Sequence, residues 1–129
     1  MSTYDTQPAD LHEFFDTAPK DVRIERSNDL DLSFTGWLVA KADIEDYTRT
    51  KWTEVHLWLS TKGSYVAMIQ QGGTTLNTVT RATAQRRFDD ILAWMREDNR
   101  GNLGGASKKV VAIACERLPW LEGADVEHV

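Results

Sequence analysis

Two strand-like segments decide the fold: LDLSFTGWLVA at residues 30–40 and WTEVHLWLS at residues 52–60. In the first, apolar residues recur so that they share one face of an extended chain: Leu30, Leu32, Phe34, Leu38 and Ala40. Such alternation is typical of a β-strand that buries one face. Gly36 interrupts the pattern and indicates either a β-bulge or a place where a large side chain packs over the backbone.

The second segment alternates more cleanly. Val55, Leu57 and Leu59 share one face, which we expect to pack into the core. The opposite face carries Trp52, Glu54, His56 and Trp58. Residues 60–64 then form a tight turn, since Gly63 can take the positive φ that hairpin turns require, and residues 65–69 return as the partner strand.

The flanking sequence completes an α+β plan. Before the hairpin we expect a short N-terminal helix over 8–17 and an edge strand around Val22 and Ile24. After it, Gly72-Gly73 predicts a turn, residues 76–80 a further strand, and Thr83 the cap of a helix. A second helix, capped by Ser107, ends before Pro119. The predicted fold is an antiparallel sheet of four to five strands, with two C-terminal helices packed on one face and a short N-terminal helix.

Length and composition predict a single domain over residues 1–129, with flexible ends at 1–7 and 122–129. Cys115 is the only cysteine, so an intramolecular disulfide is impossible, which favours a reducing compartment. No apolar run approaches the ~20 residues that span a bilayer, and the N-terminus lacks the pattern of a secretion signal. We therefore expect a cytoplasmic protein without membrane contact.

The net charge of −5 is unevenly distributed. Residues 1–60 hold twelve acidic and six basic side chains, whereas residues 61–118 hold nine basic and five acidic ones. A basic partner would accordingly bind the first half of the chain, and a polyanion the second half.

Residues 31–70 resemble the β-hairpin region of the small bacterial EXLDI proteins. The resemblance rests on Phe34-Thr35-Gly36-x-Leu38-x-Ala40, on the strand from Trp52 to Leu59, and on Thr61-x-Gly63-x-Tyr65-Val66. The C-terminal motif that names the family is absent, because this chain ends Ala124-Asp125-Val126-Glu127-His128-Val129. Since that family has no established activity, the resemblance implies a fold element and no function.

The polar face of the second strand is the first candidate site. If it is exposed, Trp52, His56 and Trp58, with Glu54 between them, form a partner-binding surface, because tryptophan dominates interface hot spots. The alternative is that Phe14 and Phe15 of the N-terminal helix cover this face and make a second small core. The sequence leaves both interpretations open.

A second candidate is a basic region between residues 81 and 109. It consists of Arg81, Arg86, Arg87, Lys108 and Lys109, which a nucleic acid or another anion would contact if they lie together. Charges on amphipathic helices more often form a solvated face.

No catalytic, metal-binding or cofactor-binding pattern stands out. Cys115 lies among apolar residues and is interpreted as a small buried side chain rather than a nucleophile. The leading hypothesis is a non-enzymatic, acidic protein-binding module, analogous to inhibitor or immunity proteins that block a basic partner. The alternatives are a nucleic-acid-associated regulator that uses the basic region, and a homodimer formed through the exposed sheet face or an open edge strand.

Overall fold

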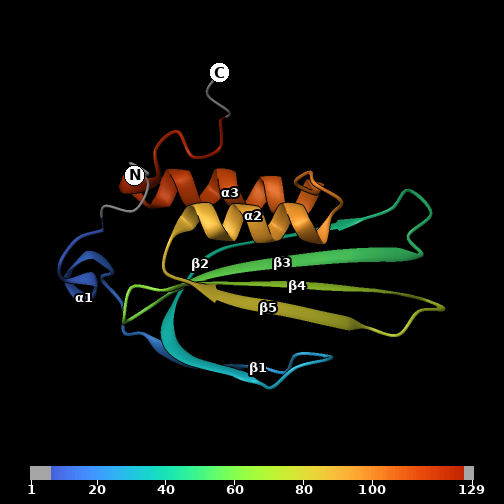
Figure 1. The fold of residues 1–129 in the computed structure, drawn as a ribbon, viewed down its shortest axis with the longest axis horizontal. Helices are drawn as coiled ribbons and strands as arrows, with labels where there is room; N and C mark the ends of the chain where they lie inside the picture. Colours follow the sequence, from blue (N-terminus) through green and yellow to red (C-terminus); the bar gives the residue numbers. More distant parts are fainter. Residues whose placement is uncertain (1–6, 127–129) are drawn as a thin grey trace.

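Five antiparallel strands form a meander in the order β1-β2-β3-β4-β5, with two helices on one face (Figure 1). The computed structural model describes residues 7–126. The strands are β1 (Lys20–Ile24), β2 (Leu32–Glu45), β3 (Lys51–Ser60), β4 (Tyr65–Gly73) and β5 (Val79–Gln85). The helices are α1 (Leu11–Phe14), α2 (Phe88–Asp98), α3 (Gly105–Arg117) and the 3₁₀ helix Pro119–Leu121.

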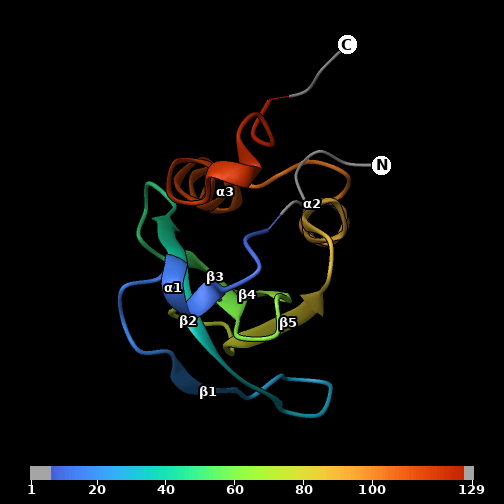
Figure 2. The ribbon, with the colours of Figure 1, turned by 90° about the vertical axis from the view of Figure 1, so that its left-hand side faces the viewer.

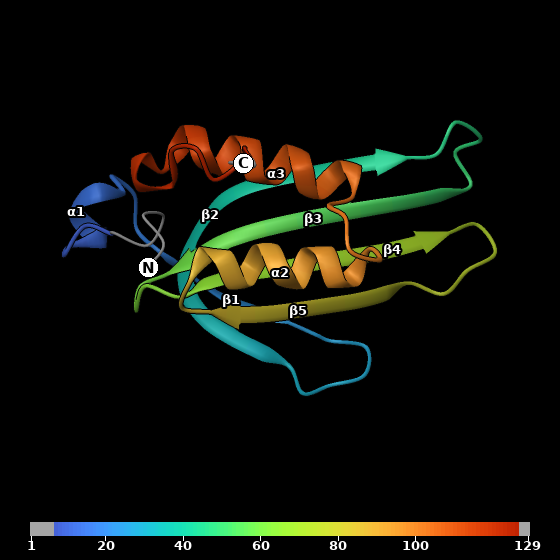
Figure 3. The same ribbon diagram turned by 45° about the horizontal axis from the view of Figure 1, so that its top comes forward.

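This architecture confirms the predicted fold class. Helix α2 packs over β4 and β5, while α3 packs over β2 and β3, so both cover the same face (Figure 3). No helix within residues 7–126 is long and apolar enough to cross a membrane. The predicted flexible ends lie largely outside the described residues, although Ala124 packs into the main core.

The boundaries after the hairpin were predicted wrongly. Gly72 and Gly73 are paired residues of β4, opposite Trp52 and Lys51, and do not form a turn. Thr83 lies inside β5, and α2 begins at Phe88 after Arg87. Ser107 also lies inside its helix, whose N-cap is Gly104. The predictions relied on the local preferences of glycine for turns and of threonine and serine for helix caps. Strand pairing and packing outweighed these preferences.

The main core lies between the helices and the sheet. As predicted, Val55, Leu57 and Leu59 face it and are fully buried. In β2, however, the register against β3 shifts between Leu38 and Ala40, so that Val39 is an extra residue. This bulge turns Trp37 and Val39 toward the helices and leaves Leu38 44% exposed on the other face. The predicted alternation therefore holds up to Leu38. Beyond the bulge it is wrong, because Ala40 faces the helices and not the side of Leu38.

A second core lies beneath the sheet because β1 and the first part of β2 curl under it (Figure 2). The buried members come from four strands: Ile24, Trp58, Val66, Met68 and Ala82. Val22, Leu32 and Phe34 pack against them from β1 and the start of β2. The helices and this curled layer therefore sandwich the left-hand half of the sheet in Figure 1.

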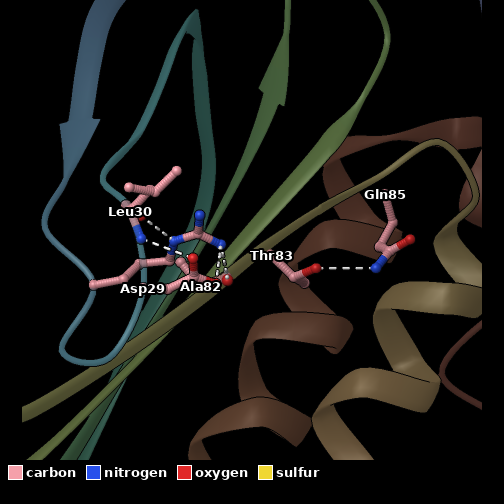
Figure 4. Close-up of polar contacts among 6 residues, drawn as sticks. Asp29, Leu30, Ala82, Thr83 and Gln85 are labelled. Atoms are coloured by element: carbon pink, nitrogen blue, oxygen red, sulfur yellow. Dashed lines mark hydrogen bonds and ion pairs between the residues drawn. The ribbon is translucent and has the colours of Figure 1, made fainter.

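The curled layer reaches across to β5, the opposite edge strand. Ser27 donates its backbone N–H to the carbonyl of Thr80 at 2.9 Å, and its hydroxyl accepts from the Thr80 N–H at 2.8 Å. Arg26 donates to the carbonyls of Leu30, at 2.6 Å, and Ala82, at 3.3 Å (Figure 4). These bonds close the sheet into a partial barrel whose interior is the second core.

The N-terminal helix is shorter than predicted and lies elsewhere. Its four residues end at Phe14, and Phe15 stacks on Trp37 with a ring-centroid distance of 4.5 Å. Phe14 contacts Trp120 edge-on at 5.0 Å. Helix α1 therefore seals one end of the main core and does not cover the polar face of β3.

Candidate functional site

The curled layer does not extend beneath the right-hand half of the sheet in Figure 1. There the side of the sheet away from the helices is open. Three residues of β2 lie there directly opposite three of β3, in the pairs Lys41 with His56, Asp43 with Glu54 and Glu45 with Trp52. We call these six residues the open face. Strand alternation places them there, because the intervening Ala42, Ile44 and Val55 point to the helices.

Trp52 is seated on this face by a glycine. Its indole lies over Gly72 of β4, where an added Cβ would come within 2.6 Å of the ring atom Cζ2. The ring remains half-buried and borders a pocket of about 500 Å³ that Leu76 and Val79 also line. Gly72 therefore holds the tryptophan at a fixed height above the sheet, with part of its surface open to a partner.

Glu54 and His56 form a hydrogen-bonded pair on the same strand. The distance from Nε2 of His56 to Oε1 of Glu54 is 2.7 Å. The imidazole also lies 5.1 Å from the Trp58 ring, measured between centroids. His56 thus marks the boundary at which the second core ends and the open face begins.

The open face carries three carboxylates, and two of them oppose each other. Asp43 and Glu54 are cross-strand neighbours, an arrangement of like charges that destabilises a sheet. Asp43 and Glu45 are both exposed, and neither has an ion-pair partner among residues 7–126. With Lys41 as its single lysine or arginine beside three carboxylates, the open face has a net negative charge.

The turn between β2 and β3 extends the open face with an aromatic tip. Tyr47 is 99% exposed at this tip. Desolvation would raise the pKa of Asp46, but the backbone N–H groups of Lys51 and Thr50 and the Thr48 and Thr50 hydroxyls all donate to its carboxylate. These bonds hold its pKa below the usual value, and they fix the turn that presents Tyr47.

Trp58 does not belong to this site. It is only 9% exposed and packs edge-on against Phe34, with ring centroids 5.7 Å apart. Of the four residues predicted to bind a partner, Trp52, Glu54 and His56 lie on the open face. The interpretation of a second small core was correct for Trp58, but β1 and β2 build that core, not the N-terminal helix.

The five predicted anion-binding residues do not form one patch. Arg81 is bound to Asp98 and Gln71, Arg86 reaches the Lys62 carbonyl at 3.4 Å, and Arg87 pairs with Asp89 at 3.6 Å. Because α2 and α3 run in opposite directions, Arg86 and Arg87 at the start of α2 lie at the other end of the helical layer from Lys108 and Lys109 (Figure 3). The structure thus separates the basic residues that the sequence grouped.

The cysteine is half-buried beside the C-terminal turn. Burial raises the pKa of the Cys115 thiol to about 11, and the charge of Asp125 adds to this rise. Since the thiolate is the nucleophile, the side chain is a weak one near neutral pH. Residues 7–126 also bring no three His, Cys, Asp or Glu side chains together in an arrangement able to hold a metal ion.

We expect Cys115 to react with a maleimide at pH 7.5 roughly a hundredfold more slowly than glutathione, because a pKa near 11 leaves few thiolates. The rate in 6 M guanidinium, where the thiol is released from its surroundings, is the control and should match glutathione. Equal rates for the folded protein and glutathione would contradict the burial of this thiol.

Asp43 and Glu45 were not assigned to the site from the sequence, because the first predicted strand ended at Ala40 and the second began at Trp52. The signal was present: Lys41, Asp43 and Glu45 alternate with Ala42 and Ile44, which is the pattern of a strand with one polar face. The role of Gly72 was missed for a related reason, since paired glycines resemble a turn when their cross-strand neighbour is unknown.

Comparisons of the chain with protein-family models, with curated proteins and with solved structures found no match. The resemblance to the EXLDI proteins therefore stays a prediction, and the function must be argued from the site itself.

Proposed function

We propose that this chain is a non-enzymatic protein-binding module whose open face binds a basic segment of a partner protein. The observation that carries the proposal is Trp52, held partly exposed over Gly72 beside Asp43 and Glu45, two carboxylates that form no ion pair among the described residues. An amphipathic aromatic ring beside carboxylates matches the chemistry of an arginine or lysine side chain, which binds both aromatic faces and carboxylates.

The carboxylates and Trp52 of the open face would act on different steps of binding. The three carboxylates would accelerate encounter with a positively charged surface, an effect that salt weakens. Trp52 would supply buried apolar area and so slow dissociation. An inhibitor or immunity-type role, in which this face masks the basic surface of a toxin or nuclease, is the biological form of the proposal that best fits such a site.

The test uses a twelve-residue peptide of alternating arginine and serine, with its glutamate counterpart as the control ligand. Bound arginine peptide should shift the NMR signals of Trp52, Glu54 and His56, and its affinity should fall between 50 and 200 mM salt. We expect Trp52→Ala to weaken binding about tenfold, since truncating a central aromatic side chain at an interface costs about 1.4 kcal/mol or more.

Trp94→Ala is the matched control, because Trp94 is a half-buried tryptophan on α2, across the sheet from the open face. This variant should retain the affinity of the unmodified protein. Equal binding of the acidic and basic peptides, or signal shifts on the helical layer in place of the open face, would contradict the proposal. Shifts centred on Lys108 and Lys109 with a DNA or RNA oligonucleotide would favour the nucleic-acid alternative instead.

A further inference from the structure

One edge of β2 has no strand partner over much of its length among the residues that the structure describes. Strand β1 pairs only with residues 32–36 of β2, whereas β3 follows the other edge as far as Glu45. Within residues 7–126, no strand pairs with the outer edge of residues 40–45. A free edge of this kind is a template for pairing with another chain.

The backbone groups that face this edge can be assigned from the ladder. Asp46 donates its N–H to the carbonyl of Lys51 at 3.0 Å, so residue 46 points toward β3. Alternation along an antiparallel strand then points residues 44, 42 and 40 toward β3 as well. The N–H and C=O groups of Lys41, Asp43 and Glu45 therefore point outward from the sheet.

We propose that two copies of this chain pair antiparallel along this edge, about a two-fold axis at Ala42. In this register, Lys41 of each copy lies directly opposite Asp43 of the other, in hydrogen-bonded backbone pairs. Opposite charges at such positions stabilise a sheet by roughly 0.2–1 kcal/mol per pair. The second copy also gives Asp43 an ion-pair partner, which residues 7–126 of its own chain do not supply, since its neighbour on β3 is Glu54.

The charges also select this register over its neighbours. An axis at Lys41 or at Asp43 places that residue opposite its own copy, and an axis at Ile44 places Asp43 opposite Glu45 twice. An axis at Ala40 brings no opposite charges together. Charged residues on edge strands usually prevent pairing, but here their order makes the edge complementary to itself.

The helical layer is compatible with this pairing. Helix α3 packs over β2 and β3, so the two copies of α3 would lie next to each other across the two-fold axis. The two copies of α3 would then contact each other on the helical side of the joined sheet. The guanidinium of Arg117 reaches the Val39 carbonyl near this edge, and half-buried Ile113 lies one helical turn before Arg117. The second copy would therefore cover the exposed part of Ile113.

The dimer would make one continuous sheet from two five-stranded sheets. Because the axis is perpendicular to that sheet, both open faces lie on the same side, and a long basic partner would meet two sites at once. The pairing itself does not depend on the proposed function, since it uses the edge of β2 and needs no ligand.

Sedimentation equilibrium at roughly 100 μM protein tests the proposal, because complexes with micromolar Kd values are populated there. We expect a mass of twice 14.6 kDa for the unmodified chain. Asp43→Lys places lysines opposite each other, and Lys41→Asp places aspartates opposite each other. Each variant should therefore weaken dimerisation at least tenfold, while their equimolar mixture should restore dimers, since each copy then complements the other.

Glu97→Lys is the control, because it changes the net charge by the same amount at an exposed position on α2. It should remain dimeric. Circular dichroism checks that each variant is folded, and rescue by mixing excludes misfolding as the cause of dissociation. A monomeric unmodified chain, a dimeric Asp43→Lys variant, or a mixture that stays monomeric would each overturn the proposed interface.

Discussion

Trp58→Ala should lower the free energy of unfolding by about 3–5 kcal/mol, the usual loss when a large aromatic side chain is removed from a core. Trp58 is the largest side chain of the second core, and it contacts Phe34 on the curled first part of β2. Alanine would leave a cavity that β1 cannot fill, because its position is fixed by pairing with β2 and by the Ser27 and Thr80 bonds. Urea denaturation followed by circular dichroism measures the change.

Trp52→Ala is the matched comparison, since both tryptophans lie on the same face of β3. The curled layer buries Trp58, whereas Trp52 lies on the open face. Trp52 keeps part of its surface in solvent, so its removal should cost about 2 kcal/mol of folding free energy, less than the removal of Trp58, and should weaken binding as well. If the two substitutions destabilise the fold equally, the curled layer does not bury Trp58 as described. If Trp58→Ala leaves stability unchanged, the second core contributes nothing to it.

The contrast between Trp52 and Trp58 shows which features of the site can be predicted from the sequence and which cannot. A period of two assigns both side chains to the face opposite Val55, Leu57 and Leu59, and the structure confirms that assignment. Periodicity within a strand says nothing of what covers the face, which depends on how the sheet bends. The bend arises where β2 leaves β1 and bulges at Val39, and the sequence marked this region only by Gly36.

Side-chain clusters were harder to predict than faces. The Asp43 and Glu54 pair depends on the register between β2 and β3, which is set by the bulge at Val39, four residues before Asp43. The predicted basic region failed for the opposite reason: its residues are close in sequence, but the helices that carry them run antiparallel and separate them. In both cases the positions of the side chains depend on how elements far apart in the sequence pack together. The residue pattern of one sequence does not predict that packing.

Gly36→Ala is the substitution at this bend with the next largest expected effect, a loss of about 3 kcal/mol of unfolding free energy. An added Cβ would lie 2.8 Å from the Ser60 Cα and closer still to the Leu59 carbonyl oxygen. Both obstacles are backbone atoms of β3, which cannot rotate away as a side chain would. Overpacking of this kind typically costs 1–3 kcal/mol, and the upper end applies where the neighbours are fixed.

The reason lies in the double pairing of this residue. Gly36 is opposite Lys20 of β1 and Ser60 of β3, so it joins the curled layer to the main sheet. Pushing β3 away here would loosen both cores at once, and thermal unfolding should shift down by roughly 10 °C. Gly104→Ala is the control, because its Cβ would meet only the Asn99 amide at 3.6 Å, an ordinary contact. If Gly36→Ala melts no earlier than Gly104→Ala, the close approach of β2 and β3 at this point is not what bends the sheet.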